Sequence, residues 1–332
     1  MNDTIRKPRY AAITAVGAYA PEQIRSNSDL EKITETSDEW IVQRTGIKER
    51  RILEKGLATS DMIVKAIESM LKEYPKDLKQ VDTLFVATST PDMLMPSTAN
   101  ILAGKLGLEG VTAIDVNAAC AGFLHVLDLG AAWIESGRAK NVLVIGADKI
   151  SAYVNIMDRS TNILFGDGAG VVWLEASEEE GVMDSILKGN GNGVEYLNIE
   201  AGGSLYPFDE EMLNSNKRHI KQEGRVVFKQ AIQSMSDSCL DVLKRNDKTI
   251  EDVNWLIPHQ ANKRIIDAVG ESIGIDVKKT LVNIEKYGNT ISATIPLCLF
   301  EYRDLIKKGD LLMFTAFGAG FSWGASLLKW SL

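Results

Sequence analysis

Short apolar runs alternate with helical patterns along most of the chain. Clear examples of the apolar runs lie at residues 83–88, 141–146, 255–257 and 311–315. Strand-like runs that alternate with helical patterns are typical of α/β proteins. The arrangement of hydrophobic and polar positions therefore predicts an α/β fold.

The second half of the chain repeats the order of elements found in the first half. Cys120 precedes an apolar helical stretch at residues 121–136 and then a strand. Asn289 precedes a similar stretch at residues 293–306, and the strand behind it follows at the same spacing. Any two α/β units look broadly alike, but the shared order favours an internal duplication. We expect the equivalent loops of the two halves to meet at one site.

The border between the halves is expected in the charged turn Ser177–Gly181, which follows a strand-like run at residues 171–174. The N-terminal half, residues 1–178, then carries Cys120, and the C-terminal half comprises residues 179–332. A length of 332 residues is compatible with two domains of ordinary size.

Composition and charge narrow the class of protein. Apolar residues make up 45% of the chain and charged residues 25%, as in an ordinary soluble globular protein. The net charge of −8 disfavours general nucleic-acid binding, which requires a basic surface. A local basic patch can still receive an acidic partner.

The sequence shows no signal peptide and no membrane span. Residues 1–10 are polar and basic with no apolar segment behind them, and no run of about 18 apolar residues is present. The cysteines, Cys120, Cys239 and Cys298, are odd in number and widely spaced, which argues against a disulfide framework and a zinc site. Reduced thiols fit a cytoplasmic protein.

Cys120 is a candidate nucleophile. It follows the end of an apolar strand, is flanked by alanines and precedes an apolar helix. The positive end of a helix dipole lowers the pKa of a nearby thiol, and small neighbours leave room for a substrate. The alternative is an inert core cysteine, which is the commoner role of a buried thiol.

His259 and Asn289 are two further candidates. His259 ends a predicted strand, where α/β proteins place ligand sites, although a hydrogen-bonded loop histidine is the alternative. Asn289 lies in Tyr287–Thr290, which has the composition of a turn, so this segment alone favours a plain turn asparagine. The remaining histidines, His125 and His219, are interpreted as a packed core residue and a solvated residue.

Two glycine-rich segments have different expected roles. Gly166–Gly170 superficially suggests nucleotide binding, but a strand-like run at residues 171–174 follows it in place of the required helix. We interpret this segment as a structural turn. Phe317–Phe321 follows a strand and can supply a backbone N–H group to an oxyanion.

Six motifs occur in order over nearly the whole chain: Asp38–Arg50, Asn117–Phe123, Phe165–Gly170, Pro258–Ile265, Tyr287–Thr290 and Phe317–Gly324. Together they resemble the ordered signatures of the β-ketoacyl-acyl-carrier-protein synthase III family. The resemblance implies a thiolase-like fold, in which two duplicated βαβαβαββ halves pack as a five-layered αβαβα sandwich. It also implies a homodimer.

The resemblance implies a decarboxylative Claisen condensation of an acyl-CoA primer with malonyl-acyl-carrier-protein, which initiates fatty acid synthesis. Cys120 would carry the acyl group as a thioester, and the backbone N–H groups of Cys120 and Ala319 would form an oxyanion hole. His259 and Asn289 would hold the malonyl thioester carbonyl. No cofactor or metal is implied, because the thioester itself accepts the electrons.

Three groups of binding residues follow from the same resemblance. Thr36, Trp40, Arg44 and Arg159 would bind coenzyme A, with the indole and a guanidinium stacked around the adenine. Phe317 and Ile291 would border the acyl pocket, and Met95 would close the acyl pocket of the partner subunit. A carrier-protein surface would comprise Lys229, Lys263 and Arg264, with Arg225 beside them.

Ile291 departs from the family pattern, which has small residues after the Gly-Asn-Thr motif. A β-branched side chain so close to Asn289 is expected to shrink the pocket or tilt the loop. The departure keeps an alternative open, a specialised condensing enzyme or acyltransferase of secondary metabolism. Two alternatives come from other functional classes: a non-catalytic acyl-binding relative and a cysteine hydrolase.

Overall fold

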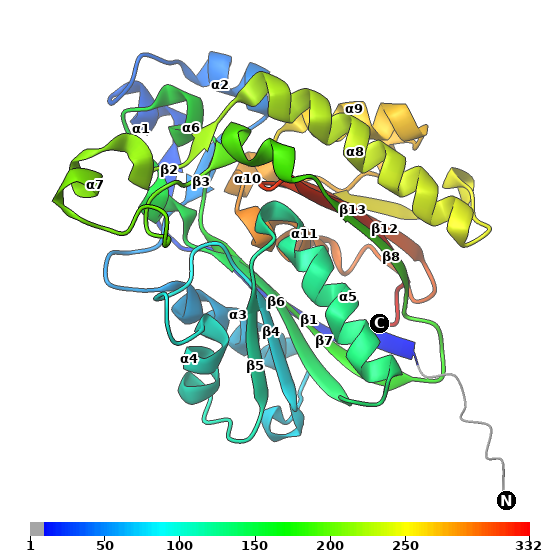
Figure 1. Ribbon diagram of the computed structural model, residues 1–332. Coiled ribbons are helices and arrows are strands. Elements are labelled where there is room, and N and C mark those ends of the chain that lie inside the picture. The colour runs from blue at the N-terminus through cyan, green and yellow to red at the C-terminus, as the bar shows by residue number, and fades with distance from the viewer. Residues whose placement is uncertain (1–9) are drawn as a thin grey trace, which may run out of the picture.

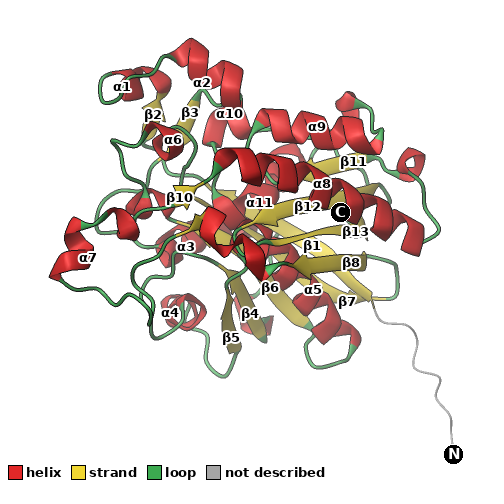
Figure 2. Cartoon of the chain, turned by 45° about the horizontal axis from the view of Figure 1, so that its top comes forward, coloured by secondary structure: helices red, strands yellow, loops and turns green. Residues whose placement is uncertain are grey.

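The computed structural model describes residues 10–332 and contains a mixed sheet of nine strands (Figures 1 and 2). The strands of the first half are β1 (Tyr10–Tyr19), β4 (Thr83–Ala87), β5 (Thr112–Val116), β6 (Asn141–Asp148) and β7 (Gly168–Ser177). The second half supplies β8 (Val182–Gly189), β11 (Trp255–Pro258), β12 (Leu311–Gly318) and β13 (Ser322–Lys329). Their order across the sheet is β11-β12-β13-β8-β1-β7-β6-β4-β5. The α/β prediction is confirmed.

Six longer helices pack on this sheet: α3 (Thr59–Glu73), α4 (Thr98–Lys105), α5 (Gly122–Glu135), α8 (Gly224–Arg245), α9 (Lys263–Ile273) and α11 (Thr294–Tyr302). Helices α3 and α4 cover the outer face of the first-half strands, and α8 and α9 cover the outer face of the second-half strands. Helices α5 and α11 lie between the two parts of the sheet (Figure 1). These five layers are the αβαβα arrangement that the resemblance implied.

The remaining elements are short. They are α1 (Asn27–Glu31), α2 (Asp38–Thr45), α6 (Arg159–Asn162), α7 (Glu210–Asn214), α10 (Ile284–Tyr287), β2 (Ile24–Ser26), β3 (Glu49–Arg51), β9 (Leu197–Asn198) and β10 (Lys221–Gln222). None of the helices in residues 10–332 combines the length and the apolar character that crossing a membrane requires.

The order of the strands is nearly symmetric about the junction of β8 and β1. On one side β1, β7, β6 and β4 follow one another, and on the other side β8, β13, β12 and β11 take the same places. A single bridge between Leu256 and Thr280 lies where β5 would be expected in the second half. This symmetry agrees with a duplicated fold, while the border near residue 178 stays a prediction.

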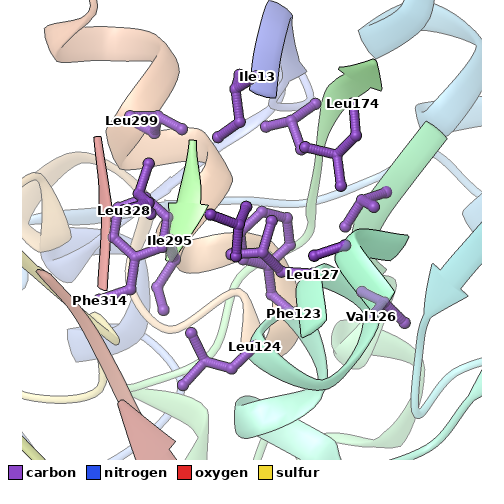
Figure 3. Close-up of a cluster of buried hydrophobic side chains, with 14 of the residues drawn as sticks. Ile13, Phe123, Leu124, Val126, Leu127, Leu174, Ile295, Leu299, Phe314 and Leu328 are labelled. Carbon is purple, nitrogen blue, oxygen red and sulfur yellow. The ribbon is translucent and has the colours of Figure 1, made fainter. Parts of the chain in front are cut away.

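The central core lies between the two parts of the sheet and is shown in Figure 3. The side chains labelled in that figure are at most 1% exposed, and burying one of this size contributes about 1.5–3 kcal/mol. Because α5 and α11 are anchored there, the loops that lead into them are held in place. The labelled members include Phe123, Leu124 and Leu127 of α5, Ile295 and Leu299 of α11, and Ile13, Leu174, Phe314 and Leu328 of the strands.

The loops before α5 and α11 have the same shape. Each helix is preceded by a 3-10 helix, Ala119–Ala121 in the first half and Ile291–Ala293 in the second. Ala119 and Ile291, the first residues of these turns, both have positive φ values, 47° and 54°. Cys120 therefore corresponds to Ser292 in the other half, and Asn289 corresponds to Asn117.

Candidate active site

A cavity of about 1150 Å³ brings together the three predicted reactive residues, Cys120, His259 and Asn289. They come from three separate segments: the loop before α5, the end of β11 and the loop before α11. Phe317 and Ala319 border the same cavity. The expectation that equivalent loops of the two halves meet at one site is confirmed.

Cys120 sits in the 3-10 helix before α5 and is 7% exposed. The backbone at Gly318 lies directly against it, because a Cβ atom placed at Gly318 would be 2.6 Å from the Cys120 nitrogen. Any side chain at position 318 would therefore displace the nucleophile loop. The neighbouring Ala319 borders the cavity beside Cys120, as expected of an oxyanion-hole residue.

The expectation of a lowered thiol pKa at Cys120 is wrong. Burial and the nearby charge of Asp148 raise the pKa of Cys120 to about 12. Hydrogen bonds from the Cys120 backbone and from the Asn289 side chain act in the opposite direction and are weaker. Desolvation thus outweighs the helix dipole here, because a thiolate loses its hydration in this enclosed position. The resting nucleophile is a neutral thiol.

His259 is 2% exposed, and hydrogen bonds hold both its backbone and its ring. Its backbone N–H donates to the Thr315 carbonyl on β12 at 2.8 Å. Its ring Nδ1 lies 2.7 Å from the Thr294 hydroxyl oxygen at the start of α11. The other ring nitrogen, Nε2, is buried and has no hydrogen-bond partner among residues 10–332. An unpartnered ring nitrogen of a cavity-lining histidine is available to a substrate.

Burial lowers the pKa of His259 to about 3. No carboxylate is among the causes of this shift, which distinguishes the residue from the histidine of a Ser-His-Asp triad. The imidazole is therefore neutral at physiological pH. A neutral ring donates a hydrogen bond from one nitrogen and accepts one at the other.

Asn289 is fixed by three hydrogen bonds that leave its amide nitrogen free to donate. Its backbone N–H donates to Leu164 O at 2.8 Å, and its carbonyl accepts from Gly166 N at 3.0 Å. Its side-chain Oδ1 accepts from Ile291 N at 2.9 Å. Because Oδ1 is occupied, the NH₂ group is the part of the side chain that faces the Cys120 thiol, with which Asn289 forms a hydrogen bond.

The strand expected behind residues 166–170 is present, but it already begins at Gly168, so the interpretation of this segment as a turn is wrong. Its start also forms a short parallel bridge between Phe165 and Asn289. The chain around the start of this segment therefore contributes to the site indirectly, because Leu164 and Gly166 are the backbone partners that orient the asparagine. This positioning role was not visible in the sequence.

The predicted coenzyme A residues gather around Trp40 on α2. The guanidinium carbon of Arg159 lies 4.9 Å from the centre of the Trp40 ring, and that of Arg44 lies 5.9 Å away. Trp40 and Arg44 border the cavity. Arg159 lies beside them and donates to Glu35 O at 2.8 Å. Thr36 does not border the cavity, because its hydroxyl is turned inward and is buried without a hydrogen-bond partner in the described chain.

The predicted acyl-pocket residues divide into two groups. Phe317 and Ile291 are 4% exposed, border the cavity, and belong to the same buried cluster as Cys120. Phe317 packs on Phe321 at 4.8 Å between ring centres. Met95 is 84% exposed and does not border the cavity of its own chain, which fits the expectation that it serves a partner subunit.

Of the predicted carrier-protein residues, Arg264 and Arg225 border the cavity, whereas Lys229 and Lys263 do not. Arg264 stacks over Phe228 at 5.4 Å. Lys229 is exposed on α8. Lys263 forms an ion pair with Asp267 at 2.5 Å, so part of its charge is already neutralised.

Three residues near the site were missed by the sequence analysis: Asp148, Ser292 and Thr294. Thr294 contacts the His259 ring, and Ser292 is hydrogen-bonded to Asp148. Hydroxyl residues at the start of a helix are usually helix caps, so their composition gave no signal of this role. Groups of three or more side chains suited to hold a metal ion are absent from residues 10–332.

Comparisons with known proteins agree on one family. Residues 114–191 match the family described as 3-oxoacyl-[acyl-carrier-protein (ACP)] synthase III, and residues 243–330 match its C-terminal part. The beta-ketoacyl-[acyl-carrier-protein] synthase III of Porphyromonas gingivalis is 48% identical over 97% of this chain and 96% of its own length. The chain belongs to the 3-oxoacyl-acyl-carrier-protein synthase III family, and the resemblance found in the sequence is confirmed.

Solved structures show the same fold. The 3-oxoacyl-[acyl-carrier-protein] synthase III of Aquifex aeolicus has a TM-score of 0.89 and 42% identity, over 96% of this chain and 100% of that one. A priming β-ketosynthase of the R1128 polyketide pathway has a TM-score of 0.90 at only 29% identity, over 98% of this chain and 97% of that one. The thiolase-like fold is therefore confirmed.

The neutral state of His259 gives a prediction for stability against pH. An unfolded chain protonates a histidine near about pH 6.5, whereas folded His259 stays neutral down to about 3. The unfolded state binds more protons in this window, so the His259 contribution to stability falls as pH drops below about 6.5. Denaturant unfolding of the wild type should show this loss, and His259→Gln should weaken it. An unchanged slope in the variant would mean that native His259 takes up a proton.

Proposed function

We propose that this protein is a β-ketoacyl-acyl-carrier-protein synthase III that condenses an acyl-CoA primer with malonyl-acyl-carrier-protein and so initiates fatty acid synthesis. The observation that supports it is the convergence of a thiol, a neutral imidazole and a carboxamide in one cavity. Thiols form acyl intermediates, while the other two groups donate hydrogen bonds without a formal charge. The reaction needs no cofactor, since the substrates supply every electron pair.

In the first half-reaction the Cys120 sulfur attacks the thioester carbonyl of acyl-CoA. The negative charge on the tetrahedral oxygen is held by the backbone N–H groups of Cys120 and Ala319. The carbon–sulfur bond to coenzyme A then breaks, and the proton of Cys120 ends on the departing coenzyme A sulfur. The attacking sulfur has to lose its proton to become nucleophilic, and that proton balances the charge on the coenzyme A sulfur that leaves.

In the second half-reaction the carboxylate of the malonyl group leaves as carbon dioxide. The electron pair of the broken carbon–carbon bond moves into the thioester carbonyl, whose oxygen accepts hydrogen bonds from His259 Nε2 and Asn289 Nδ2. These donors are stronger when the oxygen carries charge, so they favour the transition state. The α-carbon then attacks the acyl-Cys120 carbonyl, the cysteine sulfur leaves the β-ketoacyl product as a thiolate, and it takes up one proton from solvent to regenerate the thiol.

This role requires the proton of His259 on Nε2. The Thr294 hydroxyl lies 2.7 Å from His259 Nδ1 and 3.2 Å from the Ile291 carbonyl, which compete for its one proton. When the hydroxyl donates to Nδ1, the ring carries its own proton on Nε2, toward the cavity. We propose that the hydroxyl donates to Nδ1, because only this arrangement leaves an N–H at Nε2 for the substrate oxygen. Thr294 would then set the tautomer, in the way that second partners orient metal-binding histidines.

Trp40, Arg44 and Arg159 are proposed to receive the nucleotide of coenzyme A at the mouth of the cavity. The two cations already lie near the indole face and leave it suited to stacking with a flat base. The exposed cations Lys229, Arg264 and Arg225 are proposed to receive the acidic carrier protein. Lys263 contributes less, because Asp267 neutralises it.

A homodimer is proposed on the basis of the exposed edge of the sheet. Strand β5 is the last strand of the sheet, and its Ile114 side chain is 40% exposed. The loop at residues 93–95 exposes Met93, Leu94 and Met95 by 50%, 85% and 84%. An apolar edge of this kind needs a cover in a soluble protein. A cytoplasmic location is also proposed, because the three cysteines are free.

A specialised condensing enzyme of secondary metabolism remains the second candidate. Ile291 is the observation that favours it, because this side chain borders the cavity at a family position that is usually small. The fold alone does not separate the two, since a polyketide priming synthase has nearly the same TM-score as the primary enzymes. The identities of 46–48% to β-ketoacyl-acyl-carrier-protein synthases III favour the main proposal.

Separating the two half-reactions tests the proposal. Acetyl-CoA should add an acetyl group to Cys120, found by peptide mass spectrometry. Because His259 serves only the malonyl thioester, His259→Ala should still be acylated, while loss of one such donor lowers decarboxylation by about 10²–10³. Asn289→Ala should behave alike.

The cysteines provide the control for this experiment. Cys239 and Cys298 are 0% exposed and lie outside the cavity, so neither should gain the acetyl group. Acylation of either one would contradict the assignment of Cys120. Failure of acylation itself in His259→Ala would instead indicate a protease-like Cys–His pair, with His259 as the base.

Trp40→Ala tests the nucleotide site. Loss of one base–aromatic stack should weaken coenzyme A binding by about 1–3 kcal/mol, measured by calorimetry. Trp40→Phe keeps an aromatic face and should lose less. Reaction with a short acyl thioester that lacks the nucleotide should be nearly unchanged in both variants. An equal loss with both substrates would show that Trp40 is structural.

Ile291→Ser tests the acyl pocket. Removal of the branched side chain should raise the rate of Cys120 acylation by bulky acyl-CoA thioesters relative to acetyl-CoA, roughly tenfold or more for each accommodated methylene group. Ile291→Val keeps the β-branch and should retain most of the wild-type preference. The measurement is intact-protein mass spectrometry with a panel of acyl-CoA thioesters. An identical acyl profile in all three proteins would remove Ile291 from the pocket.

A further inference from the structure

Asp148 is a fully buried carboxylate close to the site that has no part in the reaction described above. It is the last residue of β6, and its equivalent at the end of β12 is Gly318, which makes room for Cys120. Burying an ionised carboxylate is costly unless hydrogen bonds replace the lost water. The first half of the chain therefore buries a carboxylate at the end of β6, where the second half has a glycine at the end of β12.

Five hydrogen-bond donors surround this carboxylate, and they come from two separate segments. Oδ1 accepts from Ser89 N at 2.7 Å, from Thr90 Oγ1 at 3.1 Å and from Thr88 Oγ1 at 3.3 Å. Oδ2 accepts from Ser292 Oγ at 2.5 Å and from Ser292 N at 3.1 Å. Asp148 thus ties the loop before α11 to the segment that follows β4.

Ser292 lies three residues beyond Asn289 in the same tight turn. Between them Ile291 has a φ of 54°, which costs a β-branched residue of order 1–3 kcal/mol unless its surroundings enforce it. This conformation directs the Ile291 N–H to Asn289 Oδ1 at 2.9 Å. The bonds from Ser292 to Asp148 hold the next residue and therefore hold the strained turn that aims the Asn289 amide.

A second, longer connection leads from the same carboxylate to the nucleophile loop. Ser89, whose N–H donates to Asp148, also donates through Oγ to Asn117 Oδ1 at 3.0 Å. Asn117 Oδ1 in turn accepts from Ala119 N at 3.3 Å. This connection passes through an exposed side chain, so we expect it to be weaker than the direct bonds to Ser292.

We propose that Asp148 is a positioning residue, which fixes the turn at residues 289–292 through Ser292 and so sets the Asn289 amide for the decarboxylation half-reaction. The inference rests on the proposed function. Asp148 does not touch the substrate, and its effect on the second half-reaction is larger than on acylation of Cys120.

The charge state of Asp148 supports this role. Burial raises the pKa of Asp148 to about 6, although hydrogen bonds from Ser292, Ser89 and Thr90 lower it, so the group is ionised at neutral pH.

The Lys149 ammonium next to Asp148 is bonded instead to the carbonyls of Glu54 and Leu57. The neighbouring Asp167 is bonded to Leu53 and Ser151. Cys120 is the other titratable group that faces Asp148, and its pKa is raised by that charge as well as by burial. A charged acceptor makes the bonds to Ser292 about twice as strong as neutral ones.

The test compares two rates in one protein. Asp148→Asn keeps the shape of the side chain but turns one acceptor into a donor that faces the N–H and hydroxyl groups of Ser89 or Ser292. Acylation of Cys120 by acetyl-CoA, followed by rapid-quench mass spectrometry, should remain close to the wild-type rate. Carbon dioxide release from malonyl-acyl-carrier-protein should fall about ten- to a hundredfold, the scale of a misplacement of about 1 Å at a reacting centre.

Two further variants serve as controls. Asp82→Asn changes a half-buried carboxylate at the opposite end of β4, which accepts from Lys140 N at 2.8 Å and Asn141 N at 3.3 Å and has no bond to Ser292, so both rates should change together or stay unchanged. Ser292→Ala removes one donor and leaves the Ser292 N–H in place. It should lower carbon dioxide release in the same direction as Asp148→Asn but less, and it keeps the test decisive if Asp148→Asn fails to fold.

The outcomes are distinct. A selective loss of decarboxylation in Asp148→Asn and Ser292→Ala, absent in Asp82→Asn, supports the proposal. A proportional loss of both rates, or no loss in either variant, overturns it and leaves Asp148 a purely structural group. If the wild-type protein itself is not acylated by acyl-CoA, the proposed function fails and not the inference about Asp148.

Discussion

The site depends on close backbone contact between the two halves of the molecule. Gly318 on β12 touches the nucleophile loop, where a Cβ atom would lie 2.6 Å from the Cys120 nitrogen. Gly146 on β6 touches the opposite loop, where a Cβ atom would lie 2.3 Å from the Ser292 carbonyl. Each half thus supplies a glycine whose lack of a side chain leaves room for the loop of the other half, which carries Cys120 in one case and Ser292 in the other. The central helices and their apolar core keep these two contacts in register, and a side chain at either position would move the thiol and the carboxamide apart.

The same enclosure determines the charge states of the reactive groups. Both groups are buried, and this desolvation keeps the Cys120 thiol protonated and the His259 ring neutral. Neutral donors are suited to a charge that appears only in the transition state, because they attract it without binding the ground state equally strongly. The one nearby carboxylate, Asp148, is tolerated because five donors surround it.

The loops before α5 and α11 have the same backbone shape but carry different side chains. Asn117 and Asn289 each accept a hydrogen bond from the residue two positions later, which has a positive φ in both cases. In the first loop the following residue is Cys120, whereas in the second it is Ser292. The thiol faces the cavity, while the hydroxyl is directed to Asp148 and binds the two halves together. A shared backbone therefore carries a nucleophile on one side and an anchor on the other.

Local periodicity and short motifs were enough to predict the α/β class and the duplicated order of elements, and to single out Cys120, His259 and Asn289 as candidates. The tertiary structure alone decided the pKa of the thiol, which the local helix signal predicted with the wrong sign. It also decided the positions of Thr294 and Asp148, whose partners lie far away in the chain. Desolvation and long-range hydrogen bonds depend on which segments enclose a group, and that information appears only when the chain is folded.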